Sequence, residues 1–187
     1  LDTPSTILTG GGCRKRIGSI VNELDAKRVL LVTDPGVIEL GVVGEITGLL
    51  ESAGCVVKVF HDVQPDPTDE NVSNGVNALN EHQAELGVAV GGGSPIDAAK
   101  VIAIRPRNNE PLPNFLGLHK VQNPGLPLVA VPTTAGTGSE CQSYALISDD
   151  ETHRKMACGD KKALPCVAIL DPELTVSQPT TCLLYTS

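Results

Sequence analysis

Short apolar runs alternate with amphipathic segments along the chain. The runs are rich in Val, Ile and Leu, and turn-forming residues follow several of them. Such runs predict buried strands, which we place at residues 28–33, 56–60, 86–90, 126–131 and 166–170, with an edge strand at 6–9. Between the runs, apolar residues recur at helical spacing. This pattern predicts helices at residues 13–24, 42–53, 68–83 and 96–104.

Strands separated by helices are typical of a parallel sheet that is covered by helices. Aromatic residues make up only 2% of the chain, so the core must consist of Val, Ile, Leu and Ala, which suits buried parallel strands. We therefore expect an α/β fold with a Rossmann-like, doubly wound parallel sheet. The segment 105–125 is rich in Pro, Asn and Gly, and we expect it to form a surface loop.

Charge and composition exclude several classes of partner. The net charge is −8, so the basic surface that nucleic-acid binding usually needs is not expected. No stretch approaches the roughly 18 apolar residues of a membrane span. The six cysteines include no C-x-x-C pair, and residues 1–7 lack the pattern of a signal peptide. We expect free thiols in the reducing cytoplasm.

The most specific local motif is a glycine turn between a strand and a helix. An apolar strand ends in Gly91-Gly92-Gly93-Ser94-Pro95, with Ser94 expected as the N-cap and Pro95 as the first helical residue. Glycine lets the backbone approach a ligand, and a helix N-terminus offers free N–H groups and a positive dipole end. The motif favours a pyrophosphate site, with a tight structural turn as the alternative.

Two further segments carry candidate chemistry. The hydroxyls of Val131-Pro-Thr-Thr-Ala-Gly-Thr-Gly-Ser-Glu140 can bind ribose or phosphate oxygens, although an ordinary polar loop fits equally well. Asp34 ends a strand, where an acid can bind a ribose 2′-hydroxyl and repel a 2′-phosphate. Asp34-Pro35-Gly36 is also a common turn.

Other familiar motifs are missing from the sequence. The absence of G-x-G-x-x-G argues against a standard Rossmann dehydrogenase, and the absence of G-x-x-x-x-G-K-[ST] weakens a phosphotransferase. No two histidines are spaced i, i+4. We expect all four to be surface residues and not metal ligands, namely His61, His82, His119 and His153.

In order and spacing, five segments across about residues 5 to 179 resemble the iron-containing (group III) alcohol dehydrogenase family. They are Leu31-Val-Thr-Asp-Pro-Gly36, Pro65-Asp-Pro-Thr68, Gly91-Gly-Gly-Ser-Pro-Ile-Asp-Ala-Ala-Lys100, Pro132-Thr-Thr-Ala-Gly-Thr-Gly-Ser-Glu140 and Leu170-Asp-Pro-Glu-Leu-Thr175. The resemblance implies a dehydroquinate synthase-like N-terminal α/β domain that binds NAD or NADP. It also implies a helical C-terminal domain that binds a divalent metal, Fe²⁺ or Zn²⁺, with the cofactor in the cleft between the domains.

The resemblance also implies cofactor contacts. Asp34 matches the acid that contacts the adenine-side ribose, and Asp97 matches a residue near the nicotinamide. The pyrophosphate is wrapped by the residues that match Gly91, Gly92, Gly93 and Ser94. The phosphates and the nicotinamide end are contacted by those that match Thr133, Thr134 and Thr137.

Three more positions belong to the cofactor site that the resemblance implies. Lys155 matches a lysine that reaches a ribose hydroxyl, and Leu174 matches a cofactor-side contact. Asp66 stands where the family usually has Asn. Because Asp cannot donate a hydrogen bond and adds negative charge beside a dianionic cofactor, we expect it to weaken binding slightly.

The implied activity is hydride transfer between NAD, or NADP, and an alcohol or aldehyde, with the metal as Lewis acid, in a homo-oligomer. We interpret residues 1–177 as the NAD(P)-binding domain. Residues 178–187 are interpreted as a truncated or non-native tail, because Cys182–Ser187 looks like translated adapter sequence. On this interpretation the helical domain and its metal ligands are missing, and the chain alone is inactive. The alternatives are a glycerol or glycerol-phosphate dehydrogenase of the same superfamily and a non-catalytic nucleotide-binding module.

Overall fold

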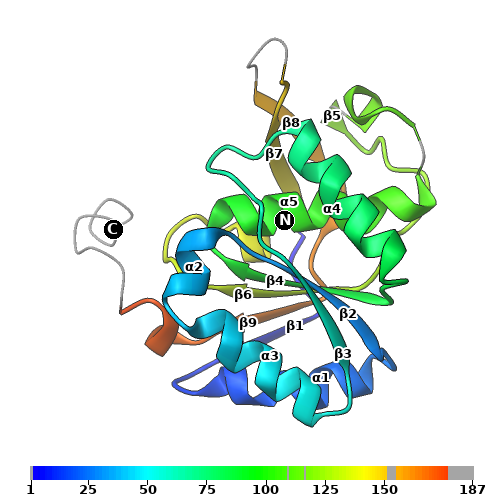
Figure 1. Ribbon diagram of the computed structural model, residues 1–187. Helices are drawn as coiled ribbons and strands as arrows, with labels where there is room; N and C mark the ends of the chain where they lie inside the picture. The colour runs from blue at the N-terminus through cyan, green and yellow to red at the C-terminus, as the bar shows by residue number, and fades with distance from the viewer. Residues whose placement is uncertain (1, 109, 116, 151–154, 177–187) are drawn as a thin grey trace.

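The computed structural model of the protein describes residues 2–108, 110–115, 117–150 and 155–176. Within these ranges, six parallel strands form the main sheet in the order β1-β9-β6-β4-β2-β3 (Figure 1). Their bounds are β1 Thr6–Thr9, β2 Arg28–Val32, β3 Val56–Phe60, β4 Leu86–Gly91, β6 Leu128–Pro132 and β9 Val167–Leu170. The predicted parallel α/β sheet, including its edge strand at 6–9, is confirmed.

Helices cover both faces of this sheet. Figure 1 shows α1 and α3 on one face and α4 and α5 on the other. The helix bounds are α1 Ile17–Glu23, α2 Pro35–Glu39, α3 Val42–Ser52, α4 Asp69–Glu81 and α5 Gly93–Ile104. Short 3₁₀ helices are η1 Cys13–Arg16, η2 Arg105–Arg107, η3 Leu112–Phe115, η4 Ser139–Cys141, η5 Lys161–Ala163 and η6 Pro172–Leu174.

The apolar runs are explained by this two-sided cover. Along β2, Leu31 packs into the core under α1 and α3, whereas its neighbour Leu30 packs into the core under α4 and α5. Successive side chains of a strand point to opposite faces, so a strand covered on both sides must be apolar at every position. In register, Leu31 lies between Val59 of β3 and Val88 of β4.

The start of α4 is fixed as the sequence predicts. The Thr68 hydroxyl accepts a hydrogen bond from the Asn71 N–H, and the Asn71 side chain accepts one from the Thr68 N–H. This reciprocal capping box satisfies donors that the first helical turn leaves free. The predicted N-cap at Thr68 is confirmed.

Two helix starts differ from the prediction. The turn expected after β2 is the short helix α2, because Asp34 and Pro35 are also good N-cap and first-turn residues. At the glycine turn, α5 begins at Gly93, with Gly92 and not Ser94 as the N-cap. Pro95 fits inside this first turn, because N–H groups there have no intrahelical acceptor to lose.

A second, smaller sheet was not predicted. It has the order β5-β8-β7 among the described residues. The strands are β5 Gly117–Leu118, β7 Tyr144–Ser148 and β8 Lys155–Gly159. The pair β7–β8 is antiparallel, but no Asn-Gly or Asp-Gly turn marks it in the sequence.

The surface loop predicted at 105–125 is wrong in part, since Asn108 and Phe115 are buried. The Asn108 side chain hydrogen-bonds the backbone of Ile104, Gln122 and Asn123, so it supplies the partners that a buried loop requires. None of the helices in the described ranges has the length and apolar character needed to cross a bilayer.

Candidate functional site

A pocket of about 610 Å³ lies where the loops after β2, β4 and β6 meet. These strands are neighbours in the sheet. The chain leaves β2 toward α3 on one face and leaves β4 toward α5 on the other, so the connections diverge between them. Such a switch point, at the carboxyl ends of parallel strands, is where open α/β sheets bind ligands. The pocket therefore lies where the topology alone predicts a site.

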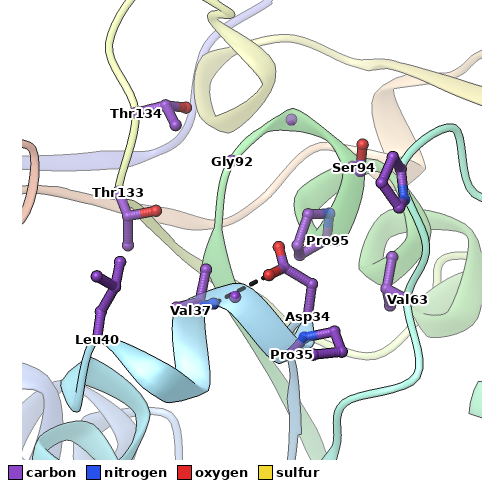
Figure 2. A pocket seen from close by; sticks show the side chains of 13 residues that line it. Asp34, Pro35, Val37, Leu40, Val63, Gly92, Ser94, Pro95, Thr133 and Thr134 are labelled. Atoms are coloured by element: carbon purple, nitrogen blue, oxygen red, sulfur yellow. Dashed lines mark hydrogen bonds between the residues drawn. The ribbon is translucent and has the colours of Figure 1, made fainter. Parts of the chain in front are cut away.

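The pocket wall formed by the glycine turn can hold an anion. Gly92, Gly93 and Ser94 line the pocket at the N-terminus of α5 (Figure 2). Among the described residues, no side chain caps that terminus. The amide groups of the first turn and the helix dipole make this end of α5 attractive to a phosphate group.

Each of the three glycines is required for a different physical reason. Gly91 does not line the pocket, but its φ of +146° favours glycine, and a Cβ there would lie 2.8 Å from the Pro95 side chain. Gly92 has an ordinary φ of −80°, but a Cβ would lie 3.3 Å from the Thr134 side chain. A Cβ on Gly93 would lie 3.3 Å from the Ser139 hydroxyl. Gly91 thus shapes the turn, whereas Gly92 keeps the space in front of Thr134 open.

Thr133 and Thr134 form the opposite wall, after β6 (Figure 2). The Thr133 residue has no exposed surface, and both hydroxyl oxygens are buried without a hydrogen-bond partner among the described residues. A buried hydroxyl that lacks a partner costs about 1–3 kcal/mol. Two such groups beside one pocket indicate a polar ligand.

Asp34 stands at the rim of the pocket and caps α2. One carboxylate oxygen accepts a hydrogen bond from the Val37 N–H at 3.0 Å. The α2 segment and the β3–α4 loop add an apolar lining, which we did not predict from the sequence: Pro35, Val37, Leu40, Val63 and Pro65. Pro35 and Pro65 belong to two of the five family-like segments, whereas Val37, Leu40 and Val63 lie beside them.

Asp66 and Lys155 are brought together, but neither lines this pocket. The Lys155 Nζ lies 2.7 Å from the Asp66 Oδ1, and both side chains are more than half exposed. This ion pair joins the β3–α4 loop to β8. Cofactor contact by either residue stays a prediction.

Three other predicted site residues also lie outside the pocket lining. Asp97 is buried and binds Lys100 and the backbone of β7. Thr137 accepts a hydrogen bond from the Ser139 N–H, and Leu174 is part of the core under α1 and α3. Their cofactor contacts stay predictions.

A second pocket of about 290 Å³ shares Thr134 with the first and lies at the carboxyl ends of β6 and β9. Glu140 lines it, and one of its carboxylate oxygens is buried without a hydrogen-bond partner among the described residues. The quoted threonine motif contains Glu140, but sequence reasoning did not single it out.

The predicted divalent metal has no cluster of ligands in the described part of the chain. There, no three His, Cys, Asp or Glu side chains are grouped closely enough to hold a metal ion. His61 is exposed and pairs with Asp62, as a surface residue would. His153 lies outside the described residues.

Comparisons with known proteins agree with the fold and the motifs. The family model of iron-containing alcohol dehydrogenases matches residues 4–172. An NAD-dependent methanol dehydrogenase from Bacillus methanolicus is 38% identical over 176 residues, which cover 94% of this chain and 46% of that protein. A 1,3-propanediol dehydrogenase from Klebsiella pneumoniae is 36% identical over 178 residues, which cover 94% of this chain and 46% of that protein.

Solved structures show the same likeness. A 1,3-propanediol oxidoreductase superposes with a TM-score of 0.95 at 35% identity, covering 98% of this chain and 48% of that one. A sulfoacetaldehyde reductase from Bifidobacterium kashiwanohense, solved in complex with NAD⁺, has a TM-score of 0.86 at 29% identity. The match covers 96% of this chain and 48% of that one. The chain spans about half the length of the curated relatives it matches. It belongs to the iron-containing alcohol dehydrogenase family.

Proposed function

We propose that this chain forms the NAD(H)-binding part of a metal-dependent alcohol dehydrogenase and holds the dinucleotide in the pocket beside the glycine turn. The main support is the uncapped N-terminus of α5 facing Thr133 and Thr134, whose buried hydroxyls have no partner among the described residues. Together they provide N–H and O–H donors around a space that suits a pyrophosphate.

Each wall of the pocket has a role in this proposal. The amides of Gly92, Gly93 and Ser94 bind phosphate oxygens, and the two threonine hydroxyls donate to phosphate or ribose oxygens. The Asp34 carboxylate accepts from a ribose 2′-hydroxyl and repels a 2′-phosphate, which favours NAD over NADP. The apolar side chains of α2 and the β3–α4 loop line the rest.

The bound nicotinamide would accept a hydride from the carbinol carbon of an alcohol, or donate one to an aldehyde. We propose that residues 1–177 form the cofactor-binding domain. Residues 178–187 lie outside the described part. The described residues include no group of His, Cys, Asp or Glu side chains that could hold the metal of the family. A homo-oligomer and a cytoplasmic location stay predictions.

The proposal is tested by titrating the 187-residue chain with NADH. Because the chain has no Trp, the fluorescence of NADH itself reports binding. We expect Thr133→Val and Thr134→Val each to weaken NADH binding about tenfold or more, because each variant loses one hydrogen bond to a charged group. Thr47→Val is the matched control, because the Thr47 hydroxyl is also buried without a partner in the described part of the chain but lies on α3, away from the pocket.

Binding that is equal in the Thr133, Thr134 and Thr47 variants would contradict this placement of the cofactor. The same preparation, supplied with Fe²⁺ or Zn²⁺, NAD and short alcohols, is expected to produce no NADH. NADH binding without turnover is also the result expected for the alternative, a nucleotide-binding module. Turnover by a longer gene product that contains the metal ligands would separate the two.

A further inference from the structure

A lysine is buried in the middle of α5, behind the cofactor pocket. Lys100 has no exposed surface and is among the largest fully buried side chains of the described chain. Burying an ammonium group costs several kcal/mol unless it is paired and hydrogen-bonded. Burial lowers the pKa of Lys100, while the nearby Asp97 and Glu140 carboxylates oppose that shift. The interactions that stabilise the buried ammonium group of Lys100 therefore need to be identified.

The partners of Lys100 come from two elements. Its Nζ lies 3.2 Å from the Asp97 Oδ1, one turn earlier on α5, and donates a 2.6 Å hydrogen bond to the Tyr144 carbonyl of β7. The other Asp97 carboxylate oxygen accepts a 3.0 Å hydrogen bond from the Leu146 N–H. One helix turn thus binds both a carbonyl and an amide of the same strand.

These backbone groups lie on the edge of β7 that faces away from β8. The order β5-β8-β7 leaves β7 at the edge of its sheet, and in an antiparallel pair every second residue directs its N–H and C=O away from the partner strand. Tyr144 and Leu146 are two residues apart, as this requires. Asp97 and Lys100 therefore take the place of a neighbouring strand and fasten β7 to α5.

The pocket lies between the first turn of α5 and the beginning of the segment 133–143, which connects β6 to β7. The first turn of α5 forms one wall, and the segment 133–143, which leads into β7, carries Thr133 and Thr134 on the other. Ser139 and Thr137 of this segment lie against Gly93, since a Cβ there would be 3.3 and 3.6 Å from their side chains. The far end of the segment is held where Tyr144 meets Lys100.

We propose that Lys100 and Asp97 are positioning residues of the cofactor pocket, which fasten β7 to α5 and so hold the segment 133–143 against the first turn of that helix. This rests on the proposed function. Neither residue of the pair lines the pocket, so we propose that its effect on the cofactor is transmitted through the segment 133–143.

Lys100→Met tests the role of the charge, because it keeps a long apolar side chain and removes the ammonium. Asp97→Asn is the milder variant, because it keeps an acceptor for the Leu146 N–H. We expect each variant to weaken NADH binding by about tenfold, as is typical when a supporting contact is lost. Amide hydrogen exchange should rise in residues 133–148 and stay unchanged in α1 and α3.

Ile46→Ala separates positioning from general loss of stability. Ile46 is buried on α3, on the other face of the sheet, so this variant lowers the melting temperature without touching the pair. We expect it to bind NADH like the parent. If Lys100→Met does not fold, Asp97→Asn decides. A parent that does not bind NADH would contradict the proposed function, whereas a folded Asp97→Asn that binds like the parent would overturn the positioning role alone.

Discussion

At the scale of single residues, Asp34 both caps a helix and lines the pocket, and a test mutation must separate the two effects. It caps α2 through the Val37 N–H and stands at the rim of the pocket. Asp34→Asn keeps a good N-cap, whereas Asp34→Ala would lose about 1 kcal/mol of stability together with the charge. We expect Asp34→Asn to lower the preference for NADH over NADPH at least tenfold, because a carboxylate about 4 Å from a phosphate charge is repelled by several kcal/mol.

The measurement is a pair of dissociation constants, for NADH and for NADPH, in the parent and in Asp34→Asn. Equal affinity of the parent for both nucleotides would argue against a ribose-reading role of Asp34. In that case its only role is to start α2.

The individual site residues were not equally predictable from sequence. Asp34, the glycine turn and Thr133 follow strand ends, and such positions meet at one edge of a parallel sheet. Asp97 follows the same turn, but it sits one helical turn deeper and faces β7. Its orientation depends on a strand that the sequence did not reveal, so local pattern could not distinguish a ligand contact from a structural one.

At the scale of elements, the glycine turn requires glycine at two positions for two reasons that mutations can separate. Gly91 is needed for the turn itself, because its φ is positive and Pro95 leaves no space for a Cβ. Gly92 is needed for the space next to Thr134. We expect Gly92→Val to abolish NADH binding with little change in melting temperature. We expect Gly91→Val to lower both the affinity for NADH and the melting temperature.

Melting curves and NADH titrations of both variants check this difference. Gly48→Ala is the control, because Gly48 lies in α3 with open space around its Cβ position, and alanine there should leave stability unchanged or slightly higher. A folded Gly92→Val that binds NADH like the parent would mean that the turn is structural only.

The inner strands of the main sheet, β2, β4, β6 and β9, could be predicted because each is covered on both faces, which makes nearly the whole run apolar. The small sheet could not. In β7 the exposed residues Tyr144 and Leu146 are as apolar as the buried Ala145 and Ile147, so no alternation of polar and apolar residues marks the strand. One edge of β7 pairs with β8, and the other edge is held by side chains of α5, a helix that is distant in sequence.

At the scale of the whole molecule, Asp171 ties the two ends of the described chain together. It follows β9, and its buried carboxylate accepts hydrogen bonds from the backbone N–H groups of Gly12, Arg14 and Glu173. The Arg14 guanidinium forms an ion pair with it at 2.8 Å. The first loop of the fold is thereby held against the last described helical turn.

Burial alone would raise the pKa of Asp171, but the hydrogen bonds from Arg14, Gly12 and Glu173 outweigh burial and lower it. A carboxyl group whose pKa is lowered by folding stabilises the fold when it is ionised. That stabilisation is complete above the unfolded pKa of about 3.9 and is lost as the pH falls through the lower, folded pKa. The sequence showed only an Asp-Pro pair after a strand, so this charge network could not be predicted.

We expect Asp171→Asn to lower the free energy of unfolding by about 2 kcal/mol at pH 7, because Arg14 loses its buried partner but keeps its ion pairs with Glu45 and Glu173. The difference from the parent should persist to about pH 5 and shrink below about pH 4, where this carboxyl group is protonated first in the unfolded chain, whose pKa is the higher one. Urea titrations at pH 7, 5 and 3.5 measure it. Asp2→Asn is the control, since Asp2 pairs with Lys161 at the surface and should contribute less than about 1 kcal/mol. A difference that grows as the pH falls would show that Asp171 is not ionised in the fold, and that the joined ends depend on packing and not on this charge.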